Sequence, residues 1–269
     1  WTCTDASFPA PPAAPACNSR GIGQRIWERI NGLSQYSRGS TVNKTRLGSG
    51  FVGAGFVTRF HIQSLLGVRD ADVAAVMSPT REHAEAAAAL ASRLGVGEPR
   101  VYGSVADMVA DPAVDAFWLC APNDVRLAVV EEMVDAVKRG AGELVGVACE
   151  KPLARNLAEA RRLLALVGET PLLHGYLENQ VFSPSVTRGK EIIWRRAVPI
   201  CGRPYLARAA EEHSGPHMPW FWQGSRQGGG VLNDMLCHSF EAARFLLTGP
   251  DEPRHTLKVR EVNAQIASL

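Results

Sequence analysis

The stretch Gly53-Ala54-Gly55-Phe56-Val57-Thr58, directly after Phe51-Val52, decides the fold of this 269-residue chain. It has the form of a glycine turn between a buried strand and a helix, with threonine in the place of the third glycine. At such a turn the first backbone N–H groups of the helix can hold a phosphate. The stretch therefore predicts a nucleotide-binding unit, although a glycine pattern alone also fits a plain tight turn.

A second register competes with this one, because Gly48-Ser49-Gly50-Phe51-Val52-Gly53 matches GxGxxG literally. That register would require a strand over the polar residues 42–47. It would also place Gly53 and Gly55 inside a helix, which is costly because glycine loses the most conformational freedom there. We therefore favour the register that begins at Gly53.

The residue that reads the adenosine ribose is expected about 20 residues past the third glycine place, which is Ser78 in this register. Serine lacks the carboxylate that usually binds a ribose 2′-hydroxyl. Thr80 and Arg81 follow, and an arginine can pair with a 2′-phosphate. This favours NADP weakly over NAD, with a solvated Arg81 in the first turn of a helix as the equal alternative.

Strands and helices alternate through the first two thirds of the chain. The predicted strands are Leu47–Val52, Ala71–Met77, 114–121, 143–149 and 172–176. The predicted helices are 54–66, Arg81–Leu94, 123–138 capped by Asn123, and 156–167 capped by Asn156. This alternation is typical of a doubly wound parallel sheet with right-handed crossovers, the Rossmann type of α/β fold.

After about residue 200 the pattern changes to a Trp- and Gly-rich loop and a helix between two expected strands, 205–211 and 257–266. We interpret this part as a second, α+β region that continues as an open sheet. Residues 1–44 include a Pro/Ala tract and indicate a flexible or non-native extension. The predicted organisation is thus 1–44 as extension, 45–170 as nucleotide-binding domain and 171–269 as C-terminal substrate domain.

Bulk composition excludes several classes of protein. A net charge of +2 with scattered basic residues argues against nucleic acid or an anionic membrane as a partner. No apolar run reaches the length of a membrane span. The six cysteines show no CxxC spacing, and Cys120 and Cys149 lie in apolar runs, which favours free thiols in a reducing cytoplasm.

Three side chains form a candidate proton-transfer group. Lys151 directly follows an apolar run, where the carboxyl end of a buried strand is expected. Asp234 and His238 are four residues apart in a helix expected to open at Gly228-Gly229-Gly230, so they would share one face. Histidine titrates nearest neutral pH and suits a general base, and a lysine ammonium stabilises an alkoxide that forms beside it. A structural histidine and a solvated lysine are the plain alternatives.

The aromatic segment 213–222 contains His213, His217, Trp220 and Trp222. Aromatic faces there can stack on a sugar ring, whereas the plain interpretation is a packed loop. The two histidines lack a third ligand nearby, so no metal site is expected.

These residues together resemble the Gfo/Idh/MocA family, the glucose-fructose oxidoreductase and inositol dehydrogenase type. The resemblance runs from about Arg46 to the C-terminus and rests on Gly53-Ala54-Gly55-Phe56-Val57 with His61, Ala121-Pro122-Asn123, Glu150-Lys151-Pro152, Glu178-Asn179 before Pro184, and the Gly228–Gly230 segment with Asp234 and His238. It implies a Rossmann domain, a C-terminal open-sheet α/β domain, and reversible oxidation of a sugar or cyclitol hydroxyl with NAD or NADP.

The resemblance also implies roles for single residues. Lys151 would contact the substrate and the nicotinamide ribose, Asp234 would orient the substrate, and His238 would be the general acid/base. The residues expected to bind the cofactor are Gly53, Ala54, Gly55, Phe56, Val57, Ser78, Thr80, Arg81, Ala121, Pro122, Asn123, Glu150, Lys151 and Asn179. The chain departs from the family pattern at Thr58 and at Arg126, where a histidine is common.

The leading hypothesis is therefore an NAD(P)-dependent oxidoreductase that acts on CH–OH groups of a small carbohydrate-like substrate. A non-catalytic nucleotide-binding sensor of the same fold is one alternative. An inactive fragment is another, because the family's C-terminal sheet usually extends further than this chain does. A homo-oligomer formed through the C-terminal sheet is also expected from the resemblance.

Overall fold

A computed structural model describes residues 46–212, 214–216, 218–253 and 256–265. The extension expected over 1–44 lies outside the described residues, as do His213 and His217. Everything described belongs to one compact unit, Arg46–Leu269.

A six-stranded sheet in the order β3-β2-β1-β4-β5-β6 forms the centre of this unit, and all neighbouring strands run parallel. The strands are β1 (Leu47–Val52), β2 (Ala71–Met77), β3 (Arg100–Tyr102), β4 (Ala116–Leu119), β5 (Gly146–Glu150) and β6 (Leu173–Leu177). The strand order reverses between β1 and β4. In sheets of this type a ligand binds outside the carboxyl ends of the strands at that reversal. The predicted Rossmann sheet is confirmed, and β6 extends it past the domain boundary expected at 170.

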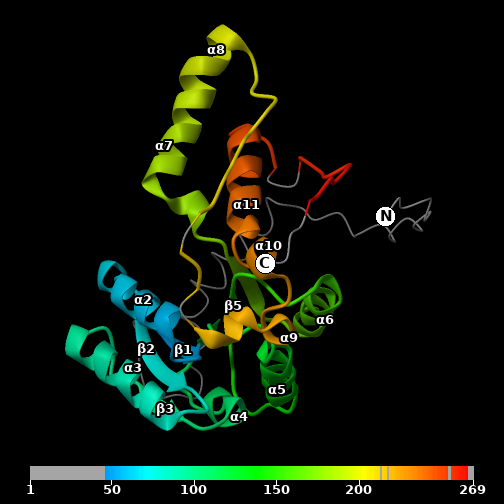
Figure 1. Cartoon of the computed structure of the whole chain (residues 1–269). Coiled ribbons are helices and arrows are strands. Elements are labelled where there is room, and N and C mark those ends of the chain that lie inside the picture. The colour runs from blue at the N-terminus through cyan, green and yellow to red at the C-terminus, as the bar shows by residue number, and fades with distance from the viewer. Residues whose placement is uncertain (1–45, 213, 217, 254–255, 266–269) are drawn as a thin grey trace. The chain divides into compact units, whose positions relative to one another are not determined.

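Helices cover both faces of the sheet, as Figure 1 shows. They are α2 (Phe56–Ser64), α3 (Arg81–Leu94), α4 (Val105–Val109), α5 (Arg126–Lys138) and α6 (Leu157–Gly168), with a 3₁₀ turn η1 (Leu65–Gly67) after α2. One apolar core joins α2 and α3 to β1 and β2 and includes Phe51, Ile62 and Ala87. The other lies under α4, α5 and α6 and includes Phe117, Met108 and Met133.

Local sequence signals account for most of these elements. β2 and α3 have the bounds that the sequence predicts, and Asn156 caps α6 by accepting a hydrogen bond from Glu159 N at 3.0 Å. The Asn123 cap is wrong: α5 begins at Arg126, with Val125 at the N-cap. The Asn123 amide instead donates to Gln227 O, a partner 104 residues away that no local signal announces.

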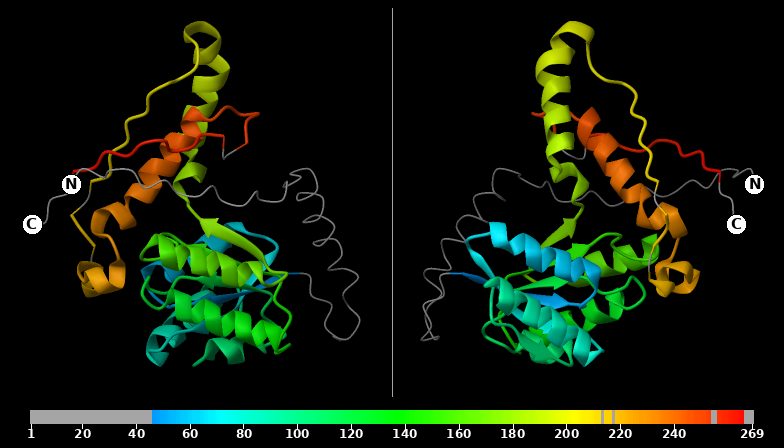
Figure 2. Two further views of the ribbon diagram at one scale, coloured as in Figure 1. Left: turned by 90° about the vertical axis from the view of Figure 1, so that its right-hand side faces the viewer. Right: turned by 60° about the vertical axis from the view of Figure 1, so that its left-hand side comes forward.

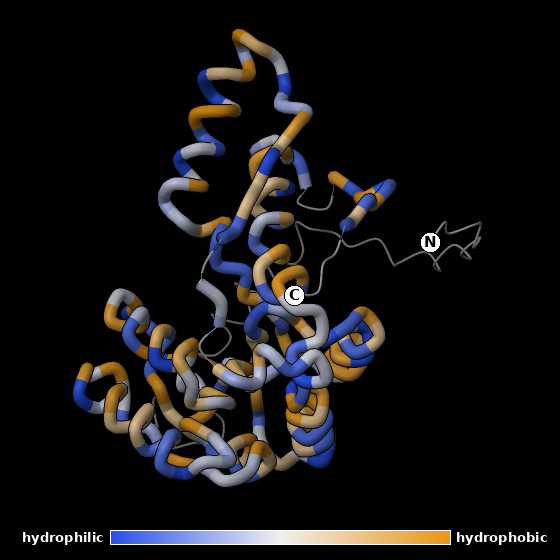
Figure 3. Tube along the Cα trace, in the orientation of Figure 1, coloured by the Kyte–Doolittle hydropathy of each residue, from blue (hydrophilic) through white to orange (hydrophobic). Residues whose placement is uncertain are grey.

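The C-terminal part of the described chain is helical. It contains η2 (Gln180–Phe182), α7 (Pro184–Ile192), the π-helical turn η3 (Ile193–Ala197), α8 (Val198–Cys201), η4 (Pro219–Trp222), α9 (Gly224–Gln227), α10 (Gly230–Asp234) and α11 (Leu236–Leu247). Figure 2 shows β6 leading into α7, with α11 alongside it. Hydrophobic and hydrophilic turns alternate along α7 (Figure 3). None of the described helices is long and apolar enough to cross a membrane.

The two strands expected in this part are not found. Residues 205–211 and the described residues 257–265 have no strand assignment, and Ile266 lies outside the description. An alternating pattern favours extended backbone, but a strand also requires a neighbour to accept its hydrogen bonds. Neither segment has such a neighbour among the described residues. The expected homo-oligomer through a C-terminal sheet therefore has no described element to carry it.

Candidate active site

The glycine turn lies at the point where the strand order reverses. Gly53 has φ +103°, and a Cβ on it would lie 2.9 Å from the carbonyl of Cys120, which follows β4. Only glycine fits this turn, because a side chain would meet both an unfavourable φ and the neighbouring backbone. The backbone thus adopts the register that begins at Gly53.

The start of α2 suits a phosphate group. Gly55 is the N-cap residue and no side chain caps the first turn, so the first N–H groups of the helix need an outside partner. A Cβ on Gly55 would have no atom within 4 Å, so there is open space over this turn. Thr58 is fully buried and donates its hydroxyl hydrogen to Gly53 O at 2.7 Å. Threonine therefore fits the third glycine place and braces the turn.

The residues that bind the adenosine ribose are expected directly after β2, where the structure places Ser78, Thr80 and Arg81. Ser78 Oγ accepts a hydrogen bond from Thr80 N at 3.3 Å. Arg81 is exposed and pairs with Glu85, one turn along α3, at 2.7 Å. A 2′-phosphate would have to compete with this carboxylate for the guanidinium.

The loop after β4 is only in part what the sequence predicts. Ala121 and Asn123 are buried and Pro122 is half-buried. Asn123 Nδ2 donates to Gln227 O at 2.8 Å, so this amide holds the C-terminal segment. The expectation that Asn123 lines a cofactor is not supported by this contact.

Arg126 has a structural role at this edge of the sheet, although sequence reasoning noted it only as a departure from the family pattern. Its side chain is buried, and its guanidinium donates to Ala121 O at 2.9 Å, to Glu150 O at 2.8 Å and to Pro152 O. A single cation thus holds the loops after β4 and β5 together. The sequence signal for Arg126 is its position four residues after Pro122. Its partners could not be predicted, because they are backbone carbonyls whose positions depend on the fold.

Glu150 ends β5 and Lys151 follows it, at the same edge of the sheet. Glu150 Oε1 lies 2.6 Å from His61 Nε2 on α2, and its Oε2 accepts from Lys151 N at 3.0 Å. These bonds hold Glu150 against α2, the helix that follows the glycine turn. Asn179 is exposed on the loop after β6.

Lys151 reaches Asp234 across the sheet edge. Lys151 Nζ donates to Asp234 Oδ1 and to Asp234 O, each at 2.9 Å, and both side chains are largely buried. The predicted single helix through Asp234 and His238 is wrong, because Met235 separates α10 from α11. His238 N bonds to Met235 O, which leaves the Asp234 carbonyl for the lysine. The break in the helix thus creates the second half of the lysine site.

His238 pairs with a carboxylate that the sequence did not assign to it. His238 Nδ1 lies 2.7 Å from Glu178 Oε1, and both side chains are less than one tenth exposed. Glu178 follows β6, whereas His238 is in the first turn of α11. Asp234 pairs with Lys151, and its expected role in orienting the substrate stays a prediction. The Glu178-Asn179 motif was a visible signal, but it did not indicate a role.

A buried glutamine shapes the segment that carries these residues. Gln227 is 1% exposed, and its Oε1 accepts from Gly229 N at 2.8 Å and Gly230 N at 2.6 Å. Its backbone oxygen also accepts from Asn123 and from Asn233. The three-glycine turn is therefore fastened to the loop after β4, and Asp234 ends the short helix α10 that begins at Gly230.

The Cys237 thiol and the Tyr176 phenol, which lie near Glu178, are neutral at physiological pH. Burial raises the pKa of Cys237 above its ordinary value, and burial raises that of Tyr176 as well. Ligand atoms of Glu178, Cys237 and His238 lie within 4.8 Å of one another, and within the described residues this is the one cluster of the kind that a metal ion could use. The distance of 2.7 Å between His238 Nδ1 and Glu178 Oε1 is that of a direct hydrogen bond.

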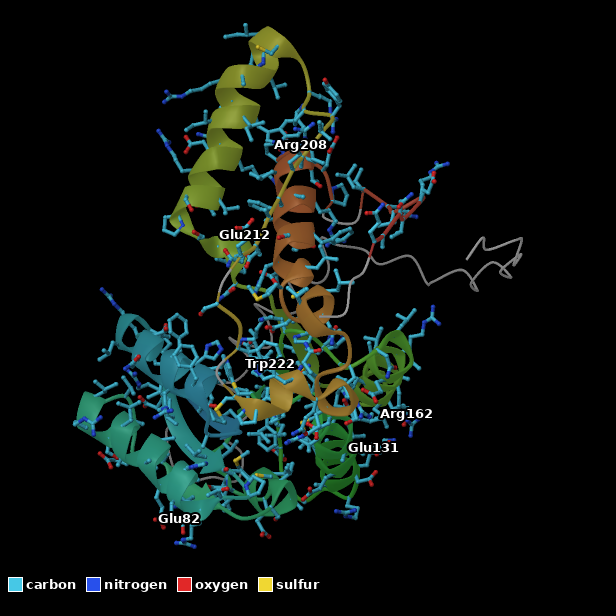
Figure 4. The ribbon with its side chains drawn as sticks, viewed as in Figure 1. Glu82, Glu131, Arg162, Arg208, Glu212 and Trp222 are labelled. Carbon is cyan, nitrogen blue, oxygen red and sulfur yellow. The ribbon has the colours of Figure 1, made fainter. Side chains whose placement is uncertain are left out.

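Within the aromatic segment the structure describes residues 214–216 and 218–222. Trp220 and Phe221 stack with ring centroids 3.9 Å apart, and Trp222 is 72% exposed. Figure 4 shows Trp222 on the segment that enters α9. An exposed indole is compatible with stacking on a sugar ring, which stays a hypothesis, whereas the stacked Trp220 and Phe221 fit the alternative of a packed loop.

Fold and site together define a Rossmann-type α/β protein with a dinucleotide-type turn, and a lysine–aspartate pair lies at the same edge of its sheet. Comparison with known proteins agrees. A profile described as "Oxidoreductase family, NAD-binding Rossmann fold" matches residues 47–175, and one described as "GFO/IDH/MocA C-terminal domain" matches residues 200–266. The chain belongs to the Gfo/Idh/MocA family.

Several curated relatives are similar over part of their length. The 1,5-anhydro-D-fructose reductase of Ensifer adhaerens is 27% identical over 78% of this chain and 59% of its own length. The myo-inositol 2-dehydrogenase of Thermotoga maritima is 26% identical over 74% and 54%. The crystal structure of GenD2 from gentamicin A biosynthesis, in complex with NAD, has a TM-score of 0.64 at 28% identity and covers 79% of this chain and 56% of GenD2. The chain spans about half the length of the curated relatives it matches.

Proposed function

We propose that the protein is an NAD(P)-dependent oxidoreductase that interconverts a hydroxyl and a ketone on a sugar- or cyclitol-like substrate. The observation that carries this proposal is the bond from Lys151 to Asp234. It joins the edge of the dinucleotide-binding sheet to the segment that bears His238. We also propose a division into cofactor and substrate domains, with the boundary expected at 170 moved past β6, because that strand pairs with β5 in the same sheet.

The residues supply the proton chemistry of such a reaction. When bound, the nicotinamide accepts or donates the hydride. His238 takes the hydroxyl proton of the substrate, and the Lys151 ammonium stabilises the negative charge on that oxygen. Asp234 holds the lysine in place through two oxygens, so the ammonium is aimed before the substrate arrives.

The substrate class rests on the relatives and on Trp222. The similar proteins named above act on anhydrofructose and inositol, and the exposed indole offers a face for a sugar ring. NAD is the cofactor named for the family and for the GenD2 complex. Arg81 leaves NADP as a weaker candidate, since Glu85 already pairs with it.

The test is cofactor reduction with a panel of sugars and cyclitols, comparing wild type, His238→Ala and His83→Ala. His83 is exposed on α3 and is the matched control. We expect His238→Ala to lose about 100- to 10,000-fold in turnover and His83→Ala to stay at the wild-type rate. Equal turnover in all three would refute the role of His238. Cofactor binding without turnover on any substrate would favour the sensor of the same fold.

A further inference from the structure

Two carboxylates serve two different partners in the candidate active site. Asp234 accepts both bonds from Lys151 Nζ, and Glu178 bonds to His238. Glu178 and His238 are among the most buried polar side chains described, at 5% and 6% exposure. A carboxylate and an imidazole at this depth interact strongly, because little water screens them.

The hydrogen-bond pattern bears on which atom carries the proton. Glu178 Oε1 accepts from Gln180 N at 2.9 Å as well as lying against His238 Nδ1. A carboxylate oxygen only accepts, so a Glu178 carboxylate requires the proton between the two side chains to be on Nδ1. In the neutral imidazole only one nitrogen is protonated, so Nε2 has the free lone pair.

We propose that Glu178 is a positioning residue, which holds His238 in the tautomer with Nδ1 protonated and Nε2 ready to accept the substrate proton. This proposal rests on the proposed function. During oxidation the hydroxyl proton moves to Nε2 and the hydride leaves the same carbinol carbon for the nicotinamide. The resulting imidazolium stays hydrogen-bonded to the Glu178 carboxylate, and the reverse reaction returns both. Glu178 itself neither gives nor takes a proton in this step.

The other charged and titratable groups around His238 do not replace this carboxylate. Lys151 and Asp234, from β5 and α10, pair with each other. Cys237 and Tyr176 are neutral because burial raises the pKa of both. On α7, which packs against α11, Lys190 lies 4.0 Å from the ring of Phe245, seven residues beyond His238 along the helix.

The first experiment reads the tautomer directly and needs no turnover. The wild-type chain labelled with ¹⁵N-histidine is compared with His238→Gln to assign the signals of His238. We expect the Nδ1–H tautomer at pH 8, and its loss in Glu178→Ala. An Nε2–H tautomer in the wild type overturns the proposal, whether or not the protein is active.

The second experiment separates charge from orientation. Glu178→Gln keeps an oxygen that can accept from Nδ1 but loses the charge, whereas Glu178→Ala loses both. We expect kcat to fall about 5-fold in Glu178→Gln and about 10- to 100-fold in Glu178→Ala, with little change in KM. The acidic limb of the pH profile should move to lower pH in Glu178→Gln, because the imidazolium has lost its counter-charge.

Glu241→Gln is the matched control, because it removes a carboxylate from the same helix whose partner is Arg244. We expect it to keep the wild-type profile. An unchanged pH profile in Glu178→Gln overturns the proposal. So does activity that EDTA abolishes and Zn²⁺ restores, since a metal on Glu178, Cys237 and His238 would occupy Nδ1.

Discussion

The turn at Gly228 offers the sharpest test of how the catalytic segment is held. Gly228 has φ +107°, and a Cβ on it would lie 2.4 Å from Arg155 O and 2.6 Å from Arg155 Cα. Replacing it by alanine introduces backbone strain and a collision with the loop after β5. Gly224, four residues earlier, is the control, because a Cβ there meets no atom within 4 Å.

The magnitude follows from these distances. An ordinary contact begins at 3.4 Å, so the turn or the Arg155 backbone must shift by about 1 Å in Gly228→Ala. A shift of that size in a catalytic group costs about 100-fold in rate. The unfavourable φ adds about 1–3 kcal/mol of strain, which lowers the melting temperature by about 2–10 °C in a chain of this size.

The assay combines thermal melting by circular dichroism with turnover and NAD titration on wild type, Gly228→Ala and Gly224→Ala. We expect Gly228→Ala to melt early and to lose turnover while it still binds NAD, because the glycine turn at Gly53 is untouched. Gly224→Ala should behave as wild type. If Gly228→Ala melts and turns over like the control, the turn does not fasten the catalytic segment.

Three further outcomes are expected. Thr58→Val removes the hydroxyl that donates to Gly53 O, so the turn loosens and the Kd for NAD should rise about 5-fold in a fluorescence titration, with Ser64→Ala on the same helix as control. Arg126→Met leaves the carbonyls of Ala121, Glu150 and Pro152 without their donor and should lower the free energy of unfolding by about 2–4 kcal/mol in urea denaturation; an unchanged midpoint would contradict the bridging role. Burial raises the pKa of Cys120 to about 12, so above about pH 9 the unfolded thiol ionises while the native thiol does not, and stability should fall with pH. Cys120→Ala should reduce that slope between pH 9 and 11 by up to about 1.4 kcal/mol per pH unit, and an identical slope would refute it.

The sheet could be predicted because its signals are local. Apolar runs such as Ala71–Met77 and the glycine turn at Gly53 determine strand, turn and helix within a few residues. Short elements such as β3 and α4 were missed, since three to five residues carry too little pattern. The prediction that Asn156 caps α6 is confirmed, and it could be made because the partner, Glu159, is only three residues away.

The predictions that failed depended on distant partners. The Asn123 amide donates to Gln227 O and does not cap a helix. The helix expected through Asp234 breaks at Met235, and the Asp234 carbonyl accepts a hydrogen bond from Lys151. Residues 205–211 have the pattern of a strand, but no described neighbour pairs with them. In each case the outcome depended on which distant partners the fold provides or leaves out, and the local pattern does not contain that information.

The sequence by itself determined the class of fold, the register of the glycine turn, and the three residues Lys151, Asp234 and His238 as candidates for the chemistry. Only the tertiary structure decided how those residues pair, with Asp234 on the lysine and Glu178 on the histidine. The physical reason is that residue type limits which bonds a side chain can form, whereas the choice among available partners depends on distances of a few ångströms set by the whole fold.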